Sequence, residues 1–246
     1  MSQRFFASVS SDSEQALLAG SEAHHLLHVM RAKPGERVLL FDGSGREWVA
    51  QIEVLRRSEV ELRILECRSV DRELPLRCVL GVALPKGERQ AWLVEKAVEL
   101  GIAQLVPLDT ERSVAQPVDK ALERLRRGVI EASKQCGRNR LMEISAACAW
   151  GEFVQPPPAG SVGWLADPSA SQAAGAALGK LRENPPPGEL RIAIGPEGGL
   201  TPAESALAVA AGWQPVSLGP RILRVETAAI ALAALVAAAA GNQRAS

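Results

Sequence analysis

The sequence predicts two parts with different folds: an N-terminal β-barrel with one helix, and a larger α/β part built on a mostly parallel sheet. Two observations support this division. Up to residue 69, apolar residues come in short runs and alternations separated by turns, as in β-strands. From residue 75 on, apolar runs alternate with stretches of helical length, as in parallel strands joined by helices. The segment between them is polar and ends in proline, so we expect domains at residues 1–70 and 74–246.

Three strands and one helix are expected in the N-terminal part. Arg37–Phe41 is an apolar run, and residues 47–55 follow it after a glycine-containing turn as the returning strand. Residues 59–66 alternate polar and apolar side chains, which is typical of a half-buried strand. Residues 22–31 have the pattern of the helix, with Ser21 as its expected N-cap. A small barrel is the simplest architecture for this set.

The C-terminal part alternates expected strands and helices. Strands are expected at residues 79–84, 105–108, 162–166, 190–194 and 216–218, and helices at residues 88–100, 119–136, 202 onward and 226–240. Gly101 and Gly137 stand where the first two helices should stop, because glycine readily adopts the left-handed conformation after a helix. Thr201 and Glu204 have the spacing of a capping box. The alternation predicts helices on both faces of the sheet.

Composition excludes several classes of protein. The chain has 246 residues, 47% hydrophobic and 23% charged, which is ordinary for a folded protein and unlike a disordered or fibrous one. Its 28 basic and 28 acidic residues balance, so any polyanion must be met by a local basic patch. The longest apolar run, residues 228–240, is mainly alanine and shorter than the roughly 18–20 residues of a membrane span. Without a signal-peptide pattern or paired cysteines, we expect a cytoplasmic protein with no membrane contact.

Two patterns that resemble ligand sites are interpreted as structural. His24 and His28 have the one-turn spacing of a zinc pair, but no suitable third ligand lies nearby in sequence, so no metal is expected. Residues 175–181 resemble a phosphate-binding loop, but they have one residue too few between the glycines and Leu181 in place of Ser or Thr. The sequence also has no GxGxxG fingerprint, so a standard dinucleotide site is not supported.

Two glycine-containing turns are the strongest candidates for a ligand site. The first, GPEGG at residues 195–199, follows a buried strand and precedes a capped helix. The second, LGPRILRVET at residues 218–227, places Arg221 and Arg224 around an apolar pair before the alanine-rich last helix. Ligands bind at the carboxyl ends of parallel strands, and glycines let the backbone approach a flat molecule closely. A plain strand-to-helix turn is the alternative interpretation for each.

A basic segment is the candidate surface for RNA. Residues 120–127 carry four cations against one carboxylate, and residues 134–140 add three cations and no acid. Within the second stretch, residues 138–140 follow the glycine that ends the helix, so they are expected in a loop. Such a concentration of cations suits a phosphate backbone, although a solvated helix face would have the same composition.

Taken together, these segments resemble the RsmE family of SPOUT methyltransferases, the 16S rRNA (uracil-1498-N3)-methyltransferases. The resemblance covers nearly the whole chain and is most specific in GPEGG, LGPRILRVET and QCGRN at residues 135–139. It also includes RFF at residues 4–6, HLLHVMR at 25–31, LFDG at 40–43, PKGE at 85–88, EKAVELG at 95–101 and ERS at 111–113. Val225 replaces a threonine that is common at that point, and the glutamate and threonine after it are kept.

The resemblance implies features that the residue pattern does not show. The N-terminal part would be a PUA-like RNA-binding barrel, and the C-terminal part a SPOUT-type parallel sheet with a deep C-terminal trefoil knot. S-adenosylmethionine would bind in the knot of a homodimer, and the substrate would be 16S rRNA within the 30S subunit. The expected cofactor-binding residues are Leu165, Ile194, Gly195, Pro196, Glu197, Gly198, Gly199, Leu218, Gly219, Ile222, Leu223 and Thr227.

Methylation at N3 of uracil defines the roles expected of the other site residues. The N3 proton must leave, so both a base and a group that stabilises the anion are needed. We expect Arg138, with Asn139, to contact the uracil carbonyls, and Glu226 to assist proton removal or to orient Arg224. A helix-terminal acid favoured by the macrodipole is the alternative for Glu226. RNA contacts are expected from Arg4, Arg31, Lys33, Arg127, Arg140, Arg221 and Arg224.

Two other functions stay open on sequence grounds. The same fold could methylate another base or ribose, for example in tRNA, because the barrel suggests a structured RNA without specifying a nucleotide. The chain could also be a non-enzymatic RNA-binding or assembly factor with a vestigial pocket. Measurable binding of S-adenosylmethionine would argue against that second alternative.

Overall fold

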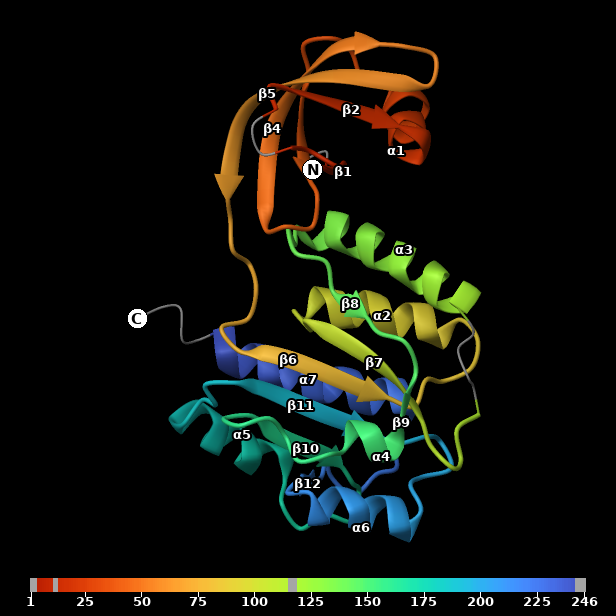
Figure 1. Ribbon diagram of the computed structural model, residues 1–246, viewed down its shortest axis with the longest axis vertical. Coiled ribbons are helices and arrows are strands. Elements are labelled where there is room, and N and C mark those ends of the chain that lie inside the picture. Colours follow the sequence, from red (N-terminus) through yellow and green to blue (C-terminus); the bar gives the residue numbers. More distant parts are fainter. Residues whose placement is uncertain (1–3, 11–12, 115–118, 242–246) are drawn as a thin grey trace. The chain divides into compact units, whose positions relative to one another are not determined.

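A computed structural model describes residues 4–10, 13–114 and 119–241, which fall into two compact units. Unit 1 comprises residues 1–73 and 130–141, and unit 2 comprises residues 74–129 and 142–246. Residues 130–136 of helix α3 (Asp119–Cys136) and the loop after it therefore belong to the unit of the N-terminal part. Figure 1 labels most of the elements of both units.

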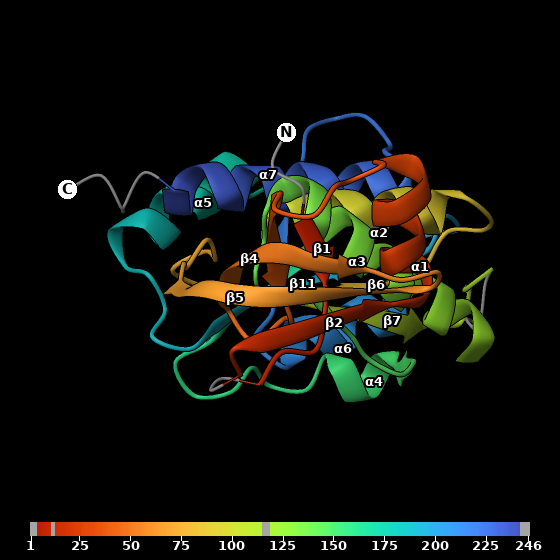
Figure 2. The same ribbon diagram turned by 90° about the horizontal axis from the view of Figure 1, so that it is seen from above.

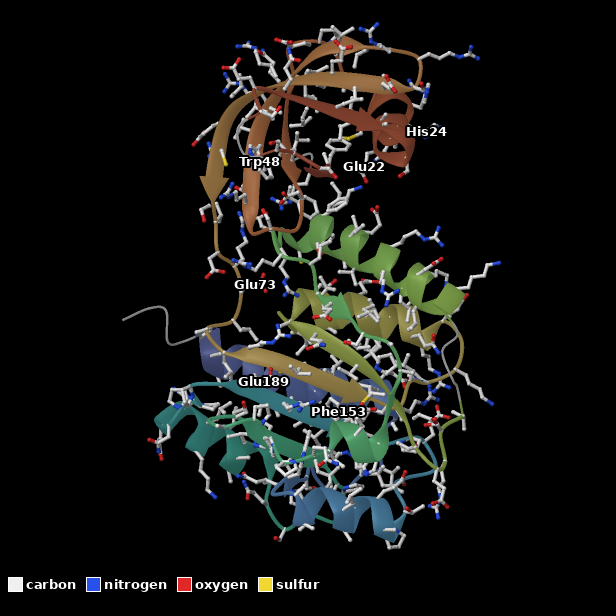
Figure 3. The ribbon with its side chains drawn as sticks, in the orientation of Figure 1. Glu22, His24, Trp48, Glu73, Phe153 and Glu189 are labelled. Carbon is white, nitrogen blue, oxygen red and sulfur yellow. The ribbon has the colours of Figure 1, made fainter. Side chains whose placement is uncertain are left out.

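Unit 1 consists of a five-stranded sheet, a helical segment at residues 20–29 and the end of α3. Its strands are β1 (Arg4–Phe6), β2 (Gln15–Ala19), β3 (Arg37–Phe41), β4 (Arg46–Leu55) and β5 (Glu59–Ser69), in the spatial order β1-β3-β4-β5-β2. β1 and β3 are parallel, and the other neighbours are antiparallel. The three expected strands are confirmed. Within the described residues no ladder joins β1 to β2, so the expected barrel is observed as an open sheet around a core that includes Trp48 (Figure 3).

The helical segment of unit 1 differs from the prediction in its start and its type. α1 (Gly20–His24) has Ala19 as its N-cap with no capping side chain, so the prediction of Ser21 as N-cap is wrong. The segment continues as a π-helical turn, η1 (His25–Val29). Arg31 follows with a φ of 53°, a left-handed conformation that is uncommon for a residue with a side chain. The predicted single helix is therefore an α-helical turn followed by a π-helical turn.

Unit 2 is built on a parallel sheet with helices on both faces, which confirms the sequence prediction. The strands are β6 (Arg77–Val82), β7 (Gln104–Asp109), β8 (Glu143–Ile144), β9 (Cys148–Ala149), β10 (Val162–Ala166), β11 (Glu189–Ile194) and β12 (Gln214–Val216). Their order is β12-β10-β11-β6-β7-β8 with β9 beside β7, and all of these pairs are parallel. The helices are α2 (Arg89–Glu99), α4 (Trp150–Phe153), α5 (Ala174–Glu183), α6 (Pro202–Ala210) and α7 (Val225–Gly241). α2, α5 and α7 lie on one face, and α4 and α6 on the other (Figure 2).

Local signals in the sequence fix the end of α2 and the start of α6. Gly101, directly after the C-cap of α2, has a φ of 80°, as predicted. Oγ1 of Thr201 accepts the backbone N–H of Glu204 at 3.3 Å, and the Glu204 carboxylate accepts the N–H of Thr201 at 2.8 Å, so the capping box is confirmed. The last strand was predicted two residues too late, because residues 217 and 218 already belong to the loop after β12. None of the helices that the structure describes is long and apolar enough to span a membrane.

Candidate functional site

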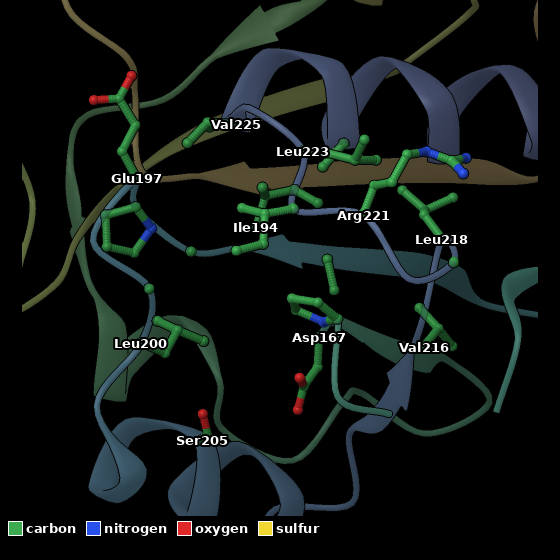
Figure 4. A pocket seen from close by; sticks show the side chains of 18 residues that line it. Asp167, Ile194, Glu197, Leu200, Ser205, Val216, Leu218, Arg221, Leu223 and Val225 are labelled. Carbon is green, nitrogen blue, oxygen red and sulfur yellow. The ribbon is translucent and has the colours of Figure 1, made fainter. Parts of the chain in front are cut away.

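A pocket of about 270 Å³ lies in unit 2, and Figure 4 shows its lining side chains. Ala166, Ile194 and Val216, the last residues of β10, β11 and β12, all line it. Because these three strands are neighbours and parallel, the pocket stands at the carboxyl edge of the sheet, where α/β proteins bind ligands. Both glycine-containing turns start at this edge.

Most of the expected cofactor-binding residues line this pocket: Ile194, Gly195, Pro196, Glu197, Gly199, Leu218, Gly219, Ile222 and Leu223. Three do not. Leu165 is buried in the core beside β11, the carbonyl of Gly198 accepts a hydrogen bond from Arg112, and Thr227 is exposed on α7. A role of these three in cofactor binding stays a prediction.

Several lining residues were missed by sequence reasoning. They are Ala166, Asp167, Pro168, Leu200, Ser205, Val216, Val225 and Ala228, together with Arg221, which was expected to contact RNA. The signal for Asp167 and Pro168 was present, since they directly follow a buried strand whose carboxyl end belongs to the ligand-binding edge. Ser205 is on α6, and no sequence pattern places that helix beside the end of β10.

Glycine is required at particular points of the two turns. A Cβ atom at Gly195 would lie 2.7 Å from Cγ of Leu200, so the absence of a side chain lets Leu200 pack over the turn. Gly199 and Gly219 have φ angles of 72° and 103°, which disfavour other residues. The N–H of Gly219 donates to Oγ of Ser217 at 3.1 Å and fixes the start of the second turn. Glycine at these points thereby lets both turns adopt the shape with which they line the pocket.

The pocket combines apolar walls with a few charges. Ile194, Leu200 and Leu223 are among its apolar side chains, while Asp167 and Glu197 supply carboxylates (Figure 4). The Oδ1 atom of Asp167 accepts hydrogen bonds from the N–H and the hydroxyl of residue 169 at 2.8 and 2.7 Å, which orients the carboxylate. Arg221 is the cation among the lining residues. The lining therefore offers two negative groups, one positive group and apolar walls.

Glu226, the candidate base, pairs with a residue that sequence reasoning missed. Its Oε1 atom is 3.5 Å from Nη1 of Arg89, and that nitrogen donates to Oε1 of Glu197 at 2.6 Å. Glu226 itself does not line the pocket, although Val225 beside it does. Among the described residues, Glu226 forms no ion pair with Arg224, and its ionic partner is Arg89. Arg89 was missed because it is far from Glu226 in the chain and no motif connects them.

The residues expected to contact uracil lie in a buried network of unit 1. Arg138 is 4% exposed and donates from Nε to Oε1 of Glu73 at 3.0 Å. Asn139 is 2% exposed; its Nδ2 donates to Glu47 at 3.2 Å, and its Oδ1 accepts from Arg4 at 2.6 Å. Figure 3 labels Glu73, at the end of the N-terminal segment of this unit. A catalytic role for Arg138 and Asn139 stays a prediction, and it would require these bonds to open.

Glu47 is the centre of this network. Its carboxylate also accepts hydrogen bonds from Arg4 at 3.0 Å and Arg72 at 3.1 Å. Burial by itself would raise the pKa of Glu47, but the hydrogen bonds from Arg4, Arg72 and Asn139 outweigh it and hold the pKa below its ordinary value. Contact of Arg4 with RNA stays a prediction, since its side chain is bound inside this network. The other expected RNA-contact residues are exposed: Arg31, Lys33, Arg127, Arg140, Arg221 and Arg224.

Two histidines of the helical segment lie close together. The rings of His24 and His28 lie 4.7 Å apart, as their one-turn spacing predicts. In the ranges that the structure describes, no group of three or more His, Cys, Asp or Glu side chains could hold a metal ion.

The sequence is similar to RNA-modifying enzymes along most of its length. A family profile described as RNA methyltransferase domain matches residues 72–237, and one described as RNA methyltransferase PUA domain matches residues 18–65. A protein of Synechocystis sp. named ribosomal RNA small subunit methyltransferase E is 38% identical over 212 residues, which cover 86% of this chain and 69% of that protein. Its namesake in Bacillus subtilis is 30% identical over 217 residues, which cover 86% of this chain and 85% of that protein.

Solved structures agree with these sequence relationships. A ribosomal RNA small subunit methyltransferase E from Neisseria gonorrhoeae, bound to S-adenosylmethionine, superimposes with a TM-score of 0.84 at 32% identity, covering 99% of this chain and 98% of that one. A protein from Legionella pneumophila, solved in complex with the same cofactor, also has a TM-score of 0.84 at 32% identity, covering 97% and 98%. The similarity therefore extends over both units.

Proposed function

The chain belongs to the ribosomal RNA small subunit methyltransferase E family of RNA methyltransferases, and from this premise we propose that it methylates N3 of one uridine, U1498, in 16S rRNA. S-adenosylmethionine is the proposed methyl donor. Two solved relatives contain that molecule, and their similarity covers nearly the whole of this chain. The pocket at the ends of β10, β11 and β12 is the proposed place for it.

The lining of the pocket fits the chemistry of S-adenosylmethionine. The molecule carries two positive groups, one carboxylate and a flat adenine ring, and it supplies a methyl group activated on sulfur. Asp167 and Glu197 match the positive groups, and Arg221 matches the carboxylate. Ile194, Leu223 and the backbone of the two glycine turns would hold the adenine. The apolar side chains around these charged groups lower the local dielectric constant, which strengthens the electrostatic interactions with the ligand.

Two requirements of the reaction are assigned to protein groups as part of this proposal. Uracil N3 has no free electron pair until its proton leaves, so Glu226 is the proposed proton acceptor. The negative charge that develops on the ring spreads to its carbonyl oxygens, and Arg138 with Asn139 is the proposed group that stabilises it. The target base must leave its stack to reach the methyl group.

The wider setting is proposed on the family relationship. The N-terminal domain, residues 1–70, would bind the RNA, and residues 74–246 would carry the catalytic domain with its C-terminal knot. The working form would be a homodimer, the substrate 16S rRNA within the 30S subunit, and the location the cytoplasm. The exposed cations of both units would contact phosphates, since each is accessible to solvent.

One observation carries the proposal: the two specific turns of the sequence meet in one pocket at the carboxyl edge of a parallel sheet. The test uses 30S subunits from a strain that lacks this enzyme, incubated with the purified protein and S-adenosylmethionine. Nuclease digestion and mass spectrometry then locate new methyl groups. A single 3-methyluridine at position 1498 is the expected result. A methyl group elsewhere, or none despite cofactor binding measured by calorimetry, would refute this substrate.

A further inference from the structure

One guanidinium connects three segments at the edge of the pocket. Arg89, the first residue of α2, donates from Nη1 to Oε1 of Glu197 at 2.6 Å, and the same nitrogen is 3.5 Å from Oε1 of Glu226. Glu197 lines the pocket within the GPEGG turn, and Glu226 follows Val225, which also lines it. Arg89 therefore ties the first glycine turn to the start of α7.

The carboxylate of Glu226 keeps one oxygen without a partner. The residue is 6% exposed, and its Oε2 atom is buried with no hydrogen-bond donor among the described residues. A buried acceptor without a donor costs free energy, so a ligand or a water is needed to satisfy it. Because Arg89 contacts Oε1, it fixes the direction in which Oε2 points. Oε2 of Glu226 can therefore accept a hydrogen bond from a further donor.

We propose that Arg89 is a positioning residue for methyl transfer, which holds Glu226 so that Oε2 accepts the N3 proton of the target uracil. This inference rests on the function proposed above and deepens it. In the step, the N3–H bond breaks and the proton goes to Oε2. The N3 electron pair forms the bond to the methyl carbon, and the carbon–sulfur bond breaks with its electron pair kept by sulfur. The carboxylate and the sulfonium both become neutral, so charge balances.

Arg112 provides a matched control, because it also forms a hydrogen bond to the GPEGG turn but to a backbone carbonyl instead of a carboxylate. Its Nη1 atom donates to the backbone carbonyl of Gly198 at 3.0 Å, next to Glu197. Within the described part of the chain, Arg112 has no carboxylate partner. Substitution of either arginine removes one hydrogen bond to the GPEGG turn, but only substitution of Arg89 also removes the ionic partner of Glu226.

The test is a double-mutant cycle on methylation of 30S subunits, measured as a single turnover with subunits and cofactor saturating. The variants are Arg89→Gln, Glu226→Gln and their combination, with Arg112→Gln alone and combined with Glu226→Gln as the control cycle. Circular dichroism melting shows that each variant folds. We expect Arg89→Gln to slow the step about 10- to 100-fold, a part of the 10²–10⁴ that a general base contributes. In the combined variant, the Arg89 change should cost nothing further, because the base it positions is already gone.

The control cycle should behave differently. The effect of Arg112→Gln should multiply with that of Glu226→Gln, since the two residues act independently. Arg89→Lys should recover part of the lost rate, because an ammonium group can still pair with the carboxylate. A normal rate for Arg89→Gln, or losses that multiply with Glu226→Gln, would overturn the role of Arg89 while leaving the proposed function intact. Absence of 3-methyluridine with the wild-type protein would refute the proposed function and this inference with it.

Discussion

Replacing Glu47 by glutamine should destabilise unit 1, although the two side chains have nearly the same shape. The Glu47 residue is 3% exposed, and its carboxylate accepts hydrogen bonds from Arg4, Arg72 and Asn139 at 3.0, 3.1 and 3.2 Å. Hydrogen bonds to a charged group contribute about 1.5–3 kcal/mol each, and removing one partner of a buried ion pair costs about 3–5 kcal/mol. The glutamine oxygen can still accept one of these bonds. We therefore expect the free energy of unfolding to fall by about 3 kcal/mol at pH 7.

Urea unfolding followed by circular dichroism measures this loss. Glu53→Gln is the matched control, because it removes a carboxylate of the same unit whose partner Arg63 is 2.8 Å away but exposed to water. The side chains of this pair are 52% and 39% exposed, so its loss should cost less than about 1 kcal/mol. If Glu47→Gln costs no more than Glu53→Gln, the argument that the buried network stabilises unit 1 is wrong.

The effect of Glu47 should also depend on pH in a defined direction. The hydrogen bonds of the network hold the pKa of Glu47 in the folded protein below the ordinary value of 4.5. A carboxylate with a lowered pKa contributes stability that is fully present above its unfolded pKa and is lost as pH falls through its folded pKa. The difference in unfolding free energy between wild type and Glu47→Gln should therefore be largest near neutrality and shrink below pH 4.5. A difference that grows on acidification would contradict the assignment.

Three further substitutions test other parts of the structure. Gly81→Ala places a Cβ atom 2.4 Å from the ring of Phe153. This overpacking should lower the free energy of unfolding, measured by urea denaturation, by about 1–3 kcal/mol. An unchanged urea midpoint would show that the Phe153 ring moves to make room. Thr201→Ala removes the cap of α6 and should cost about 1 kcal/mol in the same assay, whereas Thr201→Ser should cost much less. Arg224→Gln should lower the slope of log affinity for RNA against log salt by about 1 in filter binding, and an equal slope would exclude a phosphate contact.

Much of the fold could be predicted from the sequence because its signals are local. The capping box of Thr201 and Glu204 depends on residues three positions apart, and the glycine stop of α2 depends on one φ angle. The parallel sheet follows from the alternation of apolar runs and helices. The prediction of a helix start failed where more than one position could begin the helix. Ser21 had suitable chemistry for an N-cap, but α1 begins at Gly20 without a capping side chain and continues as a π-helix.

The candidate site was predictable where it lies in continuous motifs. The GPEGG and LGPRILRVET turns carry most of the pocket, because glycine and charge patterns within a turn can be interpreted without knowing the topology. Asp167 follows a strand that was predicted, yet its place in the pocket depends on β10 lying between β12 and β11. Strand order is set by the packing of the whole sheet, and no spacing along the chain encodes it.

By itself, the sequence determined the family, the division of the chain into a β part and an α/β part, and most of the secondary structure. It also determined the two turns that line the pocket. Tertiary structure alone decided which charges meet. It buried Arg138 against Glu73, and it joined Arg89 to Glu197 and Glu226. The physical reason is range: caps, turns and periodicity depend on neighbours within a few residues, whereas ion pairs and burial depend on distances that only the folded chain defines.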